Sequence, residues 1–289
     1  VETYAPLVAA VFSRRGTDKA KVPSIPVSIA DLGLRATNPV AEVLLAVLTL
    51  ARERVTASAL LGFLGLPPVR ERFELGDEDL ADLRELIASS GLRWAWDAED
   101  RARHGQPGLA QNTVRFAIER LAMGVLMPEP EPLEVVHGVV PLPVHSRDRV
   151  ARFGKLAAIC RALEGTSASL SEPATTKGWR ARLLAVIERF APVGPKRVAV
   201  LERLEAVLPD QSDALEFERE AVQRVVEGAF EDRRSGDRPV TGAVTVCALE
   251  PMRSVPFKVI VLLGMDDGVF PRSSKTRPTS STRAAPIAK

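Results

Sequence analysis

The middle of the chain repeats its apolar residues with the period of a helix, whereas the two ends do not. From about residue 56 to residue 237, apolar side chains recur at intervals of three and four residues, which is typical of helices with one buried face. Strand-like runs precede and follow this stretch. Such an arrangement predicts a helical region inserted between two halves of another structural unit.

Residues suited to helix starts stand where these helices should begin. Asn38 is a good N-cap, and Pro39 after it fits the first helical position. Further starts are expected at or near five other positions, which are Thr56, Asp77, Thr113, Ser146 and Thr176. Two more are expected at Pro195 and Ser212, and the last helix should run from near Asp213 to Arg234. The pattern predicts about seven helices in this region.

Three apolar runs outside the helical region read as strands. Residues 25–29 and 240–247 alternate apolar with small or polar side chains, and residues 257–263 are nearly all apolar. The third run is typical of a parallel strand buried on both faces. The sequence therefore predicts an α/β fold. Residues 1–50 and 238–271 would form one domain and residues 51–237 an all-α insertion, with a disordered tail at 272–289.

The net charge of +2 hides an uneven distribution. Residues 272–289 hold five basic residues and no acidic one, so the rest of the chain has 34 basic and 37 acidic residues, a net charge of −3. This body lacks the basic surface of an independent nucleic-acid binder. No apolar run approaches the length of a membrane helix, and the only cysteines, Cys160 and Cys247, have no metal-type spacing. We expect a cytoplasmic protein with free thiols.

The segment from residue 248 to residue 271 carries the most informative motif. It resembles the part of UvrD/Rep-type superfamily-1 helicases that reads Thr-Leu-His-Ser-Ala-Lys-Gly-Leu-Glu-Phe, then a strand and Gly-Met-x-x-Gly-x-Phe-Pro. The matching residues are Gly264, Met265, Gly268, Phe270 and Pro271. The polar positions differ, because the helicase His, Lys, Gly and Glu are replaced by Glu250, Arg253, Ser254 and Pro256.

These replacements resemble the RecC-type (gamma) subunit of exodeoxyribonuclease V, which has a Pro-Met-Arg-Ser-x-Pro-Phe sequence here. Three further stretches are similar to the same family. They are Thr3 to Leu7, Ile25 to Asp31 with Asn38-Pro39, and Ser90 to Trp94 with Asp97 and Gln111 to Thr113. The resemblance covers residues 1–272. It identifies the chain as an internal fragment of an inactivated superfamily-1 helicase-like protein.

The resemblance implies a fold, a function and partners. The fold would be a RecA-like helicase domain, P-loop NTPase-like with degenerate ATPase motifs, interrupted by the helical insertion. The protein would be a non-catalytic DNA-binding and scaffold subunit in double-strand break repair and recombination with Chi recognition. Its partners would be RecB-type and RecD-type subunits and double- and single-stranded DNA, with no membrane. No catalytic, cofactor-binding or metal-binding residue is expected in this chain, and ATP and Mg²⁺ would be used by the partner subunits.

Arg253 and Ser254 are the candidate DNA-binding residues. They stand just before the predicted strand 257–263, where the helicases approach the DNA backbone. An Arg suits a phosphate by its charge and its bidentate geometry. The alternative is an ordinary solvated or ion-paired Arg.

Other chemistry-bearing residues have simpler interpretations. Trp94 and Trp96 could stack on bases, but without a stripe of alternating basic and aromatic residues we favour core packing. Asp266 and Asp267 are adjacent in a turn, so they favour a solvated turn over a Mg²⁺ site. Three histidines stand in predicted loops without a catalytic partner, namely His104, His137 and His145.

Three other functions are compatible with the sequence. An active superfamily-1 ATPase would need a Walker motif elsewhere, and the altered residues at 250, 253, 254 and 256 argue against it. An AddB-type nuclease subunit would carry four iron–sulfur cysteines in its full-length chain. A helical interaction module unrelated to DNA is the third alternative.

Overall fold

The computed structural model describes residues 4–12, 26–29, 33–127, 135–210, 215–231, 244–247 and 256–265. Contacts between Cα atoms divide the chain into two compact units. Residues 1–31 and 237–289 belong to unit 1, and residues 32–236 belong to unit 2.

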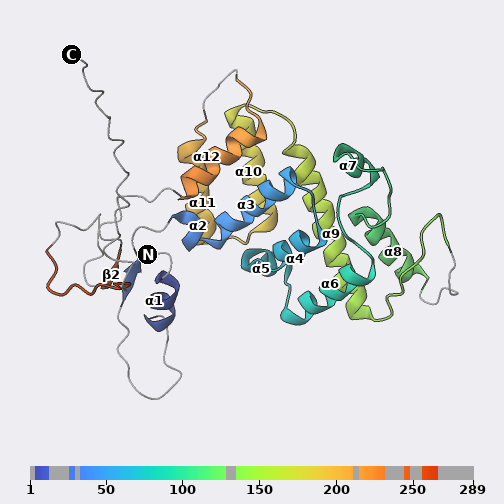
Figure 1. Cartoon of the computed structure of the whole chain (residues 1–289), viewed down its shortest axis with the longest axis horizontal. Helices are drawn as coiled ribbons and strands as arrows, with labels where there is room; N and C mark the ends of the chain where they lie inside the picture. The colour runs from blue at the N-terminus through green and yellow to red at the C-terminus, as the bar shows by residue number, and fades with distance from the viewer. Residues whose placement is uncertain are drawn as a thin grey trace, which may run out of the picture. The chain divides into compact units, whose positions relative to one another are not determined.

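Unit 2 is built from helices joined by connections of different lengths, as Figure 1 shows. Its first six helices are α2 (Leu34–Thr37), α3 (Pro39–Arg52), α4 (Ala57–Leu64), α5 (Pro67–Phe73), α6 (Asp77–Ser89) and α7 (Ala98–Arg103). The later helices are α8 (Val114–Leu126), α9 (Arg147–Ser169), α10 (Thr176–Phe190), α11 (Pro195–Val207) and α12 (Arg219–Glu231).

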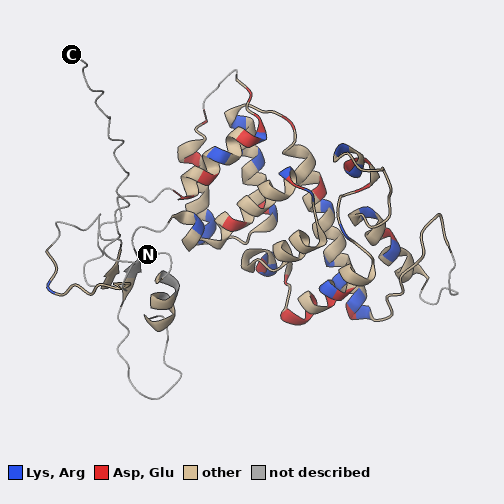
Figure 2. Ribbon diagram, in the orientation of Figure 1, with Lys and Arg blue, Asp and Glu red and all other residues tan. Residues whose placement is uncertain are grey.

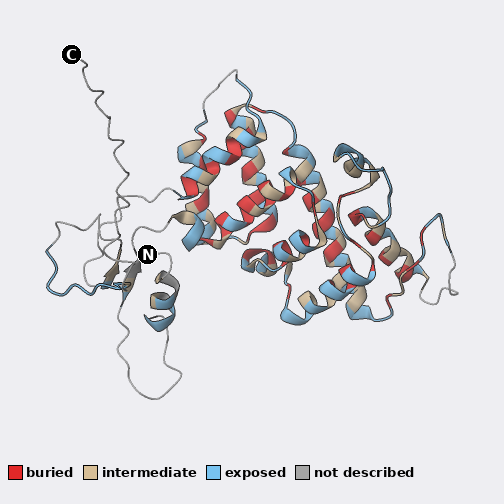
Figure 3. Ribbon diagram, viewed as in Figure 1, coloured by how far each residue is buried: buried red, intermediate tan, exposed pale blue. Residues whose placement is uncertain are grey.

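Helix α3 lies at the centre of the larger part of unit 2. It contacts α9, α10, α11, α12 and α5, and eight of its fourteen residues are buried. Helices α4, α5, α10, α11 and α12 pack against it, and α6 and α8 pack against the long helix α9. Figure 3 shows the buried residues of these helices in red. The ring of Phe190 on α10 meets that of Phe63 on α4 edge-on, with centroids 5.3 Å apart. This packing is the hydrophobic core of the unit.

Several of the predicted helix starts are confirmed. The side chains of Asn38, Thr56, Thr113 and Ser146 each accept a backbone N–H from the first turn of the helix that follows. Helix α10 is capped by Thr175, one residue before the expected Thr176. The last helix, α12, begins at Arg219, after the expected start near Asp213, and its expected end at Arg234 lies outside the described residues.

A close approach between α8 and the chain after residue 135 depends on glycine. A Cβ atom on Gly124 would lie 1.6 Å from the carbonyl oxygen of Leu142, which no side chain tolerates. The amide of Leu142 donates to the carbonyl of Arg120 at 2.9 Å. The glycine therefore lets the backbone of this segment lie directly against the helix.

Unit 1 holds helix α1 (Ala5–Phe12) and two short strands, β1 (Val27–Ile29) and β2 (Val244–Val246). The strands pair in parallel, with Val27 opposite Val244 and Ile29 opposite Val246. The ring of Tyr4 lies close to Gly264, whose φ of +74° favours glycine.

The predicted α/β fold is wrong, because the described residues form an all-α fold. Within them, β1 and β2 are the only paired strands, with three residues each. Residues 257–263 form no strand, and the side chains of Val259 and Val261 are 78% and 75% exposed. A doubly buried strand needs hydrogen-bonding neighbours and covering helices, and the described residues supply neither to this run. The prediction of a RecA-like helicase domain is therefore also wrong.

The predicted domain boundaries do not depend on the fold class. Helix α3 belongs to unit 2, so the helical unit begins before residue 50 in the structure. The assignment of residues 1–50 and 238–271 to one interrupted domain stays a prediction.

Candidate nucleic-acid interface

The two residues predicted to bind DNA, Arg253 and Ser254, lie outside the described residues, and so do Asp266 and Asp267. Their roles stay predictions. The described chain offers a different group of aromatic and charged side chains, at the corner where α7 and α8 meet the ends of α3 and α6.

Backbone hydrogen bonds bring two distant segments together at this corner. The amide of Ala95 donates to the carbonyl of Val55 at 2.8 Å, and the amide of Ala57 donates to that of Arg93 at 2.9 Å. This antiparallel bridge pairs Thr56 with Trp94. The segment that follows α3 therefore lies directly beside the two tryptophans.

The two tryptophans have different environments. Trp96 is only 9% exposed and packs into the core of unit 2, which confirms the packing interpretation for this residue. Trp94 is half-buried. The guanidinium carbon of Arg54 lies 5.3 Å from the centroid of the Trp94 ring, and that of Arg101 lies 4.9 Å away. Both are within cation–π range.

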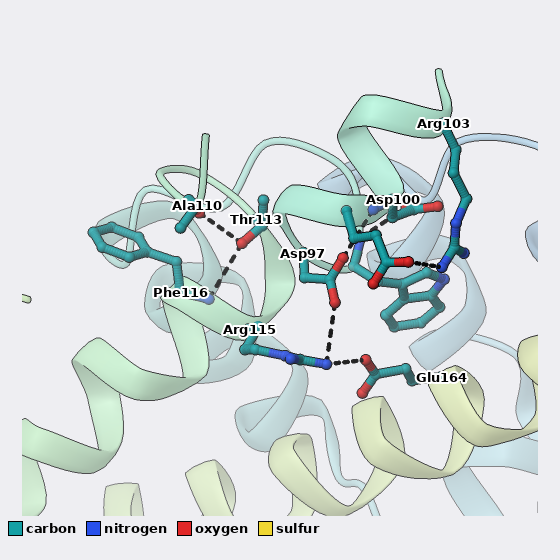
Figure 4. Close-up of polar contacts among 10 residues, drawn as sticks. Asp97, Asp100, Arg103, Ala110, Thr113, Arg115, Phe116 and Glu164 are labelled. Atoms are coloured by element: carbon teal, nitrogen blue, oxygen red, sulfur yellow. Dashed lines mark hydrogen bonds and ion pairs between the residues drawn. The ribbon is translucent and has the colours of Figure 1, made fainter. Parts of the chain in front are cut away.

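Figure 4 shows how ion pairs fix the corner. The Asp97 side chain caps α7 by accepting the amide of Asp100 at 2.8 Å, and its other oxygen lies 3.1 Å from the Arg115 guanidinium. Arg115 also contacts Glu164 on α9 at 2.9 Å. The hydrogen bond to Glu164 raises the pKa of Arg115 above its usual value. These contacts tie α7, α8 and α9 together.

A shallow cavity of about 280 Å³ opens beside this ion network. Asp97, Glu99 and Glu119 line it together with Arg115 and the apolar Phe116. Its charged residues are of both signs, and Asp97 and Arg115 neutralise one another. The arrangement suits a structural contact that holds the helices together.

A second ion network joins α6 to α9, and Figure 2 shows acidic residues along α6 and basic residues along α9. Arg152 contacts Asp79 at 2.6 Å and also Asp82. The Asp79 carboxylate accepts the amide of Gly76 at 2.9 Å. This backbone hydrogen bond, followed by that from Arg152, lowers the pKa of Asp79 below its ordinary value.

The remaining reactive groups show no catalytic arrangement within the described residues. Burial raises the pKa of the Cys160 thiol to about 12, so this thiol is not a nucleophile at neutral pH. His104 Nε2 lies 3.9 Å from Asp100 Oδ1. No group of three or more His, Cys, Asp or Glu side chains that could hold a metal ion occurs in the described ranges.

Sequence reasoning named Trp94 as a possible base-stacking residue but missed its partner Arg54, which lies far from it in the chain. Arg54 follows α3 and Arg101 lies on α7. Only the bridge between Thr56 and Trp94 brings Arg54 to the ring. A contact that depends on tertiary pairing gives no local pattern in the sequence.

The described part of the chain thus belongs to the all-α class of helical domains. Residues 37–237 match the family described as RecBCD enzyme subunit RecC fourth domain. The chain is 32% identical over 280 residues to RecBCD enzyme subunit RecC of Mycobacterium tuberculosis H37Rv, covering 95% of this chain and 25% of that protein. The chain belongs to the RecC family.

Two further relatives have the same name. RecBCD enzyme subunit RecC of Mycolicibacterium smegmatis is 34% identical over 290 residues, with 94% of this chain and 26% of the relative covered. That of Escherichia coli K12 is 28% identical over 284 residues, with 94% and 24% covered. The chain therefore spans about a quarter of the length of these relatives. Among the described helices, none is both long enough and apolar enough to span a membrane.

Proposed function

We propose that this chain is part of a non-catalytic DNA-binding and scaffold subunit of a RecBCD-type helicase–nuclease complex. The observation that carries the proposal is the similarity to RecC subunits along 94–95% of the chain. The partners would be RecB-type and RecD-type subunits, which would use ATP and Mg²⁺, and the complex would act in the cytoplasm.

The proposed role of the complex is double-strand break repair and recombination with recognition of Chi, as the family resemblance implies. The subunit would guide double- and single-stranded DNA. Net charge supports a shared DNA site rather than an independent one, because residues 1–271 have a net charge of −3. Arg253 and Ser254 are the proposed backbone contacts.

The test is the Arg253→Ala variant of the full-length subunit, assembled with its partners. If Arg253 meets a phosphate, affinity for labelled duplex ends should fall about equally for all sequences. The slope of log affinity against log salt should decrease by roughly one. Arg103→Ala is the matched control, because its guanidinium already contacts Glu99 at 3.1 Å.

Unchanged affinity and salt slope in Arg253→Ala would remove this residue from the interface. A loss confined to Chi-containing DNA would instead make it a residue that reads sequence. An assembled complex without any affinity for duplex ends would contradict the proposed function itself.

A further inference from the structure

Trp94 presents an indole whose ring N–H is not used by any described residue. It is half-buried, and its ring N–H donates to no acceptor among the residues that the structure describes. The His104 ring lies edge-on to it, with centroids 6.1 Å apart. An exposed part of an indole and a free donor are features that a ligand can use.

The guanidinium of Arg54 lies over this indole, but no polar contact with a described residue holds it there. It is exposed, and no ion pair or hydrogen bond joins its side chain to any described residue. Its guanidinium can therefore move from the ring to a phosphate, and only the cation–π interaction with Trp94 is given up when it does. Arg101 is more firmly fixed, because its Nη1 donates to the carbonyl of Leu109 at 3.0 Å.

The acidic residues near Trp94 are engaged with other partners. Glu53 contacts Arg52 at 2.5 Å, Glu99 contacts Arg103, and Asp97 contacts Arg115. The Asp100 carboxylate accepts the Trp96 amide at 3.0 Å and lies near His104. The positive charges of Arg54 and Arg101 are therefore not neutralised by an ion pair with a described residue.

Trp179 shows what a purely structural pair of the same type looks like in this unit. The Arg182 guanidinium lies 5.2 Å from its ring centroid. Trp179 is fully buried, and its ring N–H donates to the carbonyl of Phe217 at 2.7 Å. Arg182 is itself held by the carbonyl of Glu172. Trp94 and Arg54 lack each of these restraints.

We propose that Trp94, Arg54 and Arg101 form a contact site for single-stranded DNA. One base stacks on the Trp94 indole, and Arg54 turns outward to an adjacent phosphate while Arg101 remains at the ring. Every base has a π face, so the contact tolerates any sequence. This inference rests on the proposed DNA-binding function and places one contact of that function in the helical unit.

The test uses the full-length subunit in its assembled complex, with an iodouracil-substituted oligothymidylate as probe. Irradiation should crosslink the probe to Trp94, as mapped by mass spectrometry. In fluorescence anisotropy, Trp94→Ala should weaken binding of the same oligothymidylate about five-fold or more, which is the lower end for loss of one base stack. Trp94→Phe should retain most of the affinity, because it keeps an aromatic face.

Arg54→Ala should weaken binding and lower the salt slope by about 0.7, because it removes one phosphate contact to a single strand. Its matched control is Arg182→Ala, which removes an equivalent cation–π pair from a buried tryptophan and should leave affinity unchanged. Because Arg54 is exposed, its variant also keeps the test valid if Trp94→Ala fails to fold.

The inference is overturned if the wild-type complex binds the probe but forms no crosslink to Trp94 and Arg54→Ala binds equally well. Loss of affinity in Arg54→Ala with normal binding by Trp94→Ala would show attraction without stacking and would also overturn it. In both cases the proposed function stands. A wild-type complex that binds no DNA would instead contradict the proposed function.

Discussion

Asn38 connects two helices that are distant in the sequence. Its side chain is 5% exposed, accepts the amide of Val40 at 3.0 Å, and donates to the carbonyl of Lys196 at 2.7 Å. The first contact caps α3 and the second fixes the start of α11. One buried amide thus satisfies backbone groups of both helices, as buried polar groups must be satisfied.

Asn38→Ala should weaken the α3–α11 junction by about 2 kcal/mol, from the missing cap and the lost hydrogen bond to the Lys196 carbonyl. Hydrogen exchange of the full-length protein, followed by mass spectrometry, should show faster exchange in peptides from both helices. Asn38→Ser is the control, because serine caps a helix but is too short to reach Lys196. It should affect α11 alone, and equal exchange in all three proteins would contradict the assignment.

At the scale of elements, the contact between α6 and α9 is the most strongly charged in unit 2. Arg152 and Lys155 on α9 face Asp79 and Asp82 on α6, and Arg149 contacts Glu85 at 3.1 Å. Ion pairs at a surface contribute little one by one, but a network around an Arg with two carboxylate partners orients the helices. The contact should therefore depend on pH.

The lowered pKa of Asp79 fixes the sign of this dependence. Its carboxylate stabilises the fold above the ordinary value of 3.8, and this contribution is lost as pH falls through the lower folded-state pKa. Asp79→Asn should reduce the Tm near neutral pH. The difference from wild type should shrink progressively as the pH is lowered below 3.8 in a calorimetric series. A difference that is constant with pH would contradict this.

The sequence predicted the helices better than the strands, for a physical reason. A capping residue such as Thr56 or Ser146 acts on the first turn beside it, so the signal is local. A buried strand depends on neighbours elsewhere in the chain. The apolar run at 257–263 has the composition of such a strand, yet in the structure its side chains are exposed and no ladder includes it.

At the scale of the whole molecule, similarity and charge constrain function more than the fold does. The family was recognisable from separated motifs, and the match along 95% of the chain agrees. The pairing of Arg54 with Trp94 was not recognisable, because Arg54 reaches the ring only through tertiary pairing. A segment with a net charge of −3 over residues 1–271 also gives no general signal for DNA. Its contacts must be few and supplemented by other parts of the complex.

The distribution of charge predicts how residues 1–271 behave alone. With a net charge of −3, this segment should bind duplex DNA far more weakly than the assembled complex, because one or two Arg contacts release few counterions. Anisotropy titrations at several salt concentrations should give a salt slope of about −1 to −2.

Circular dichroism should first establish that the segment is helical. The 289-residue chain is the matched control, because residues 272–289 add five basic residues and no acidic one. It should bind more tightly and with a steeper slope, without preference for sequence. Tight binding with a steep slope by residues 1–271 would show instead that this segment is an independent DNA-binding domain.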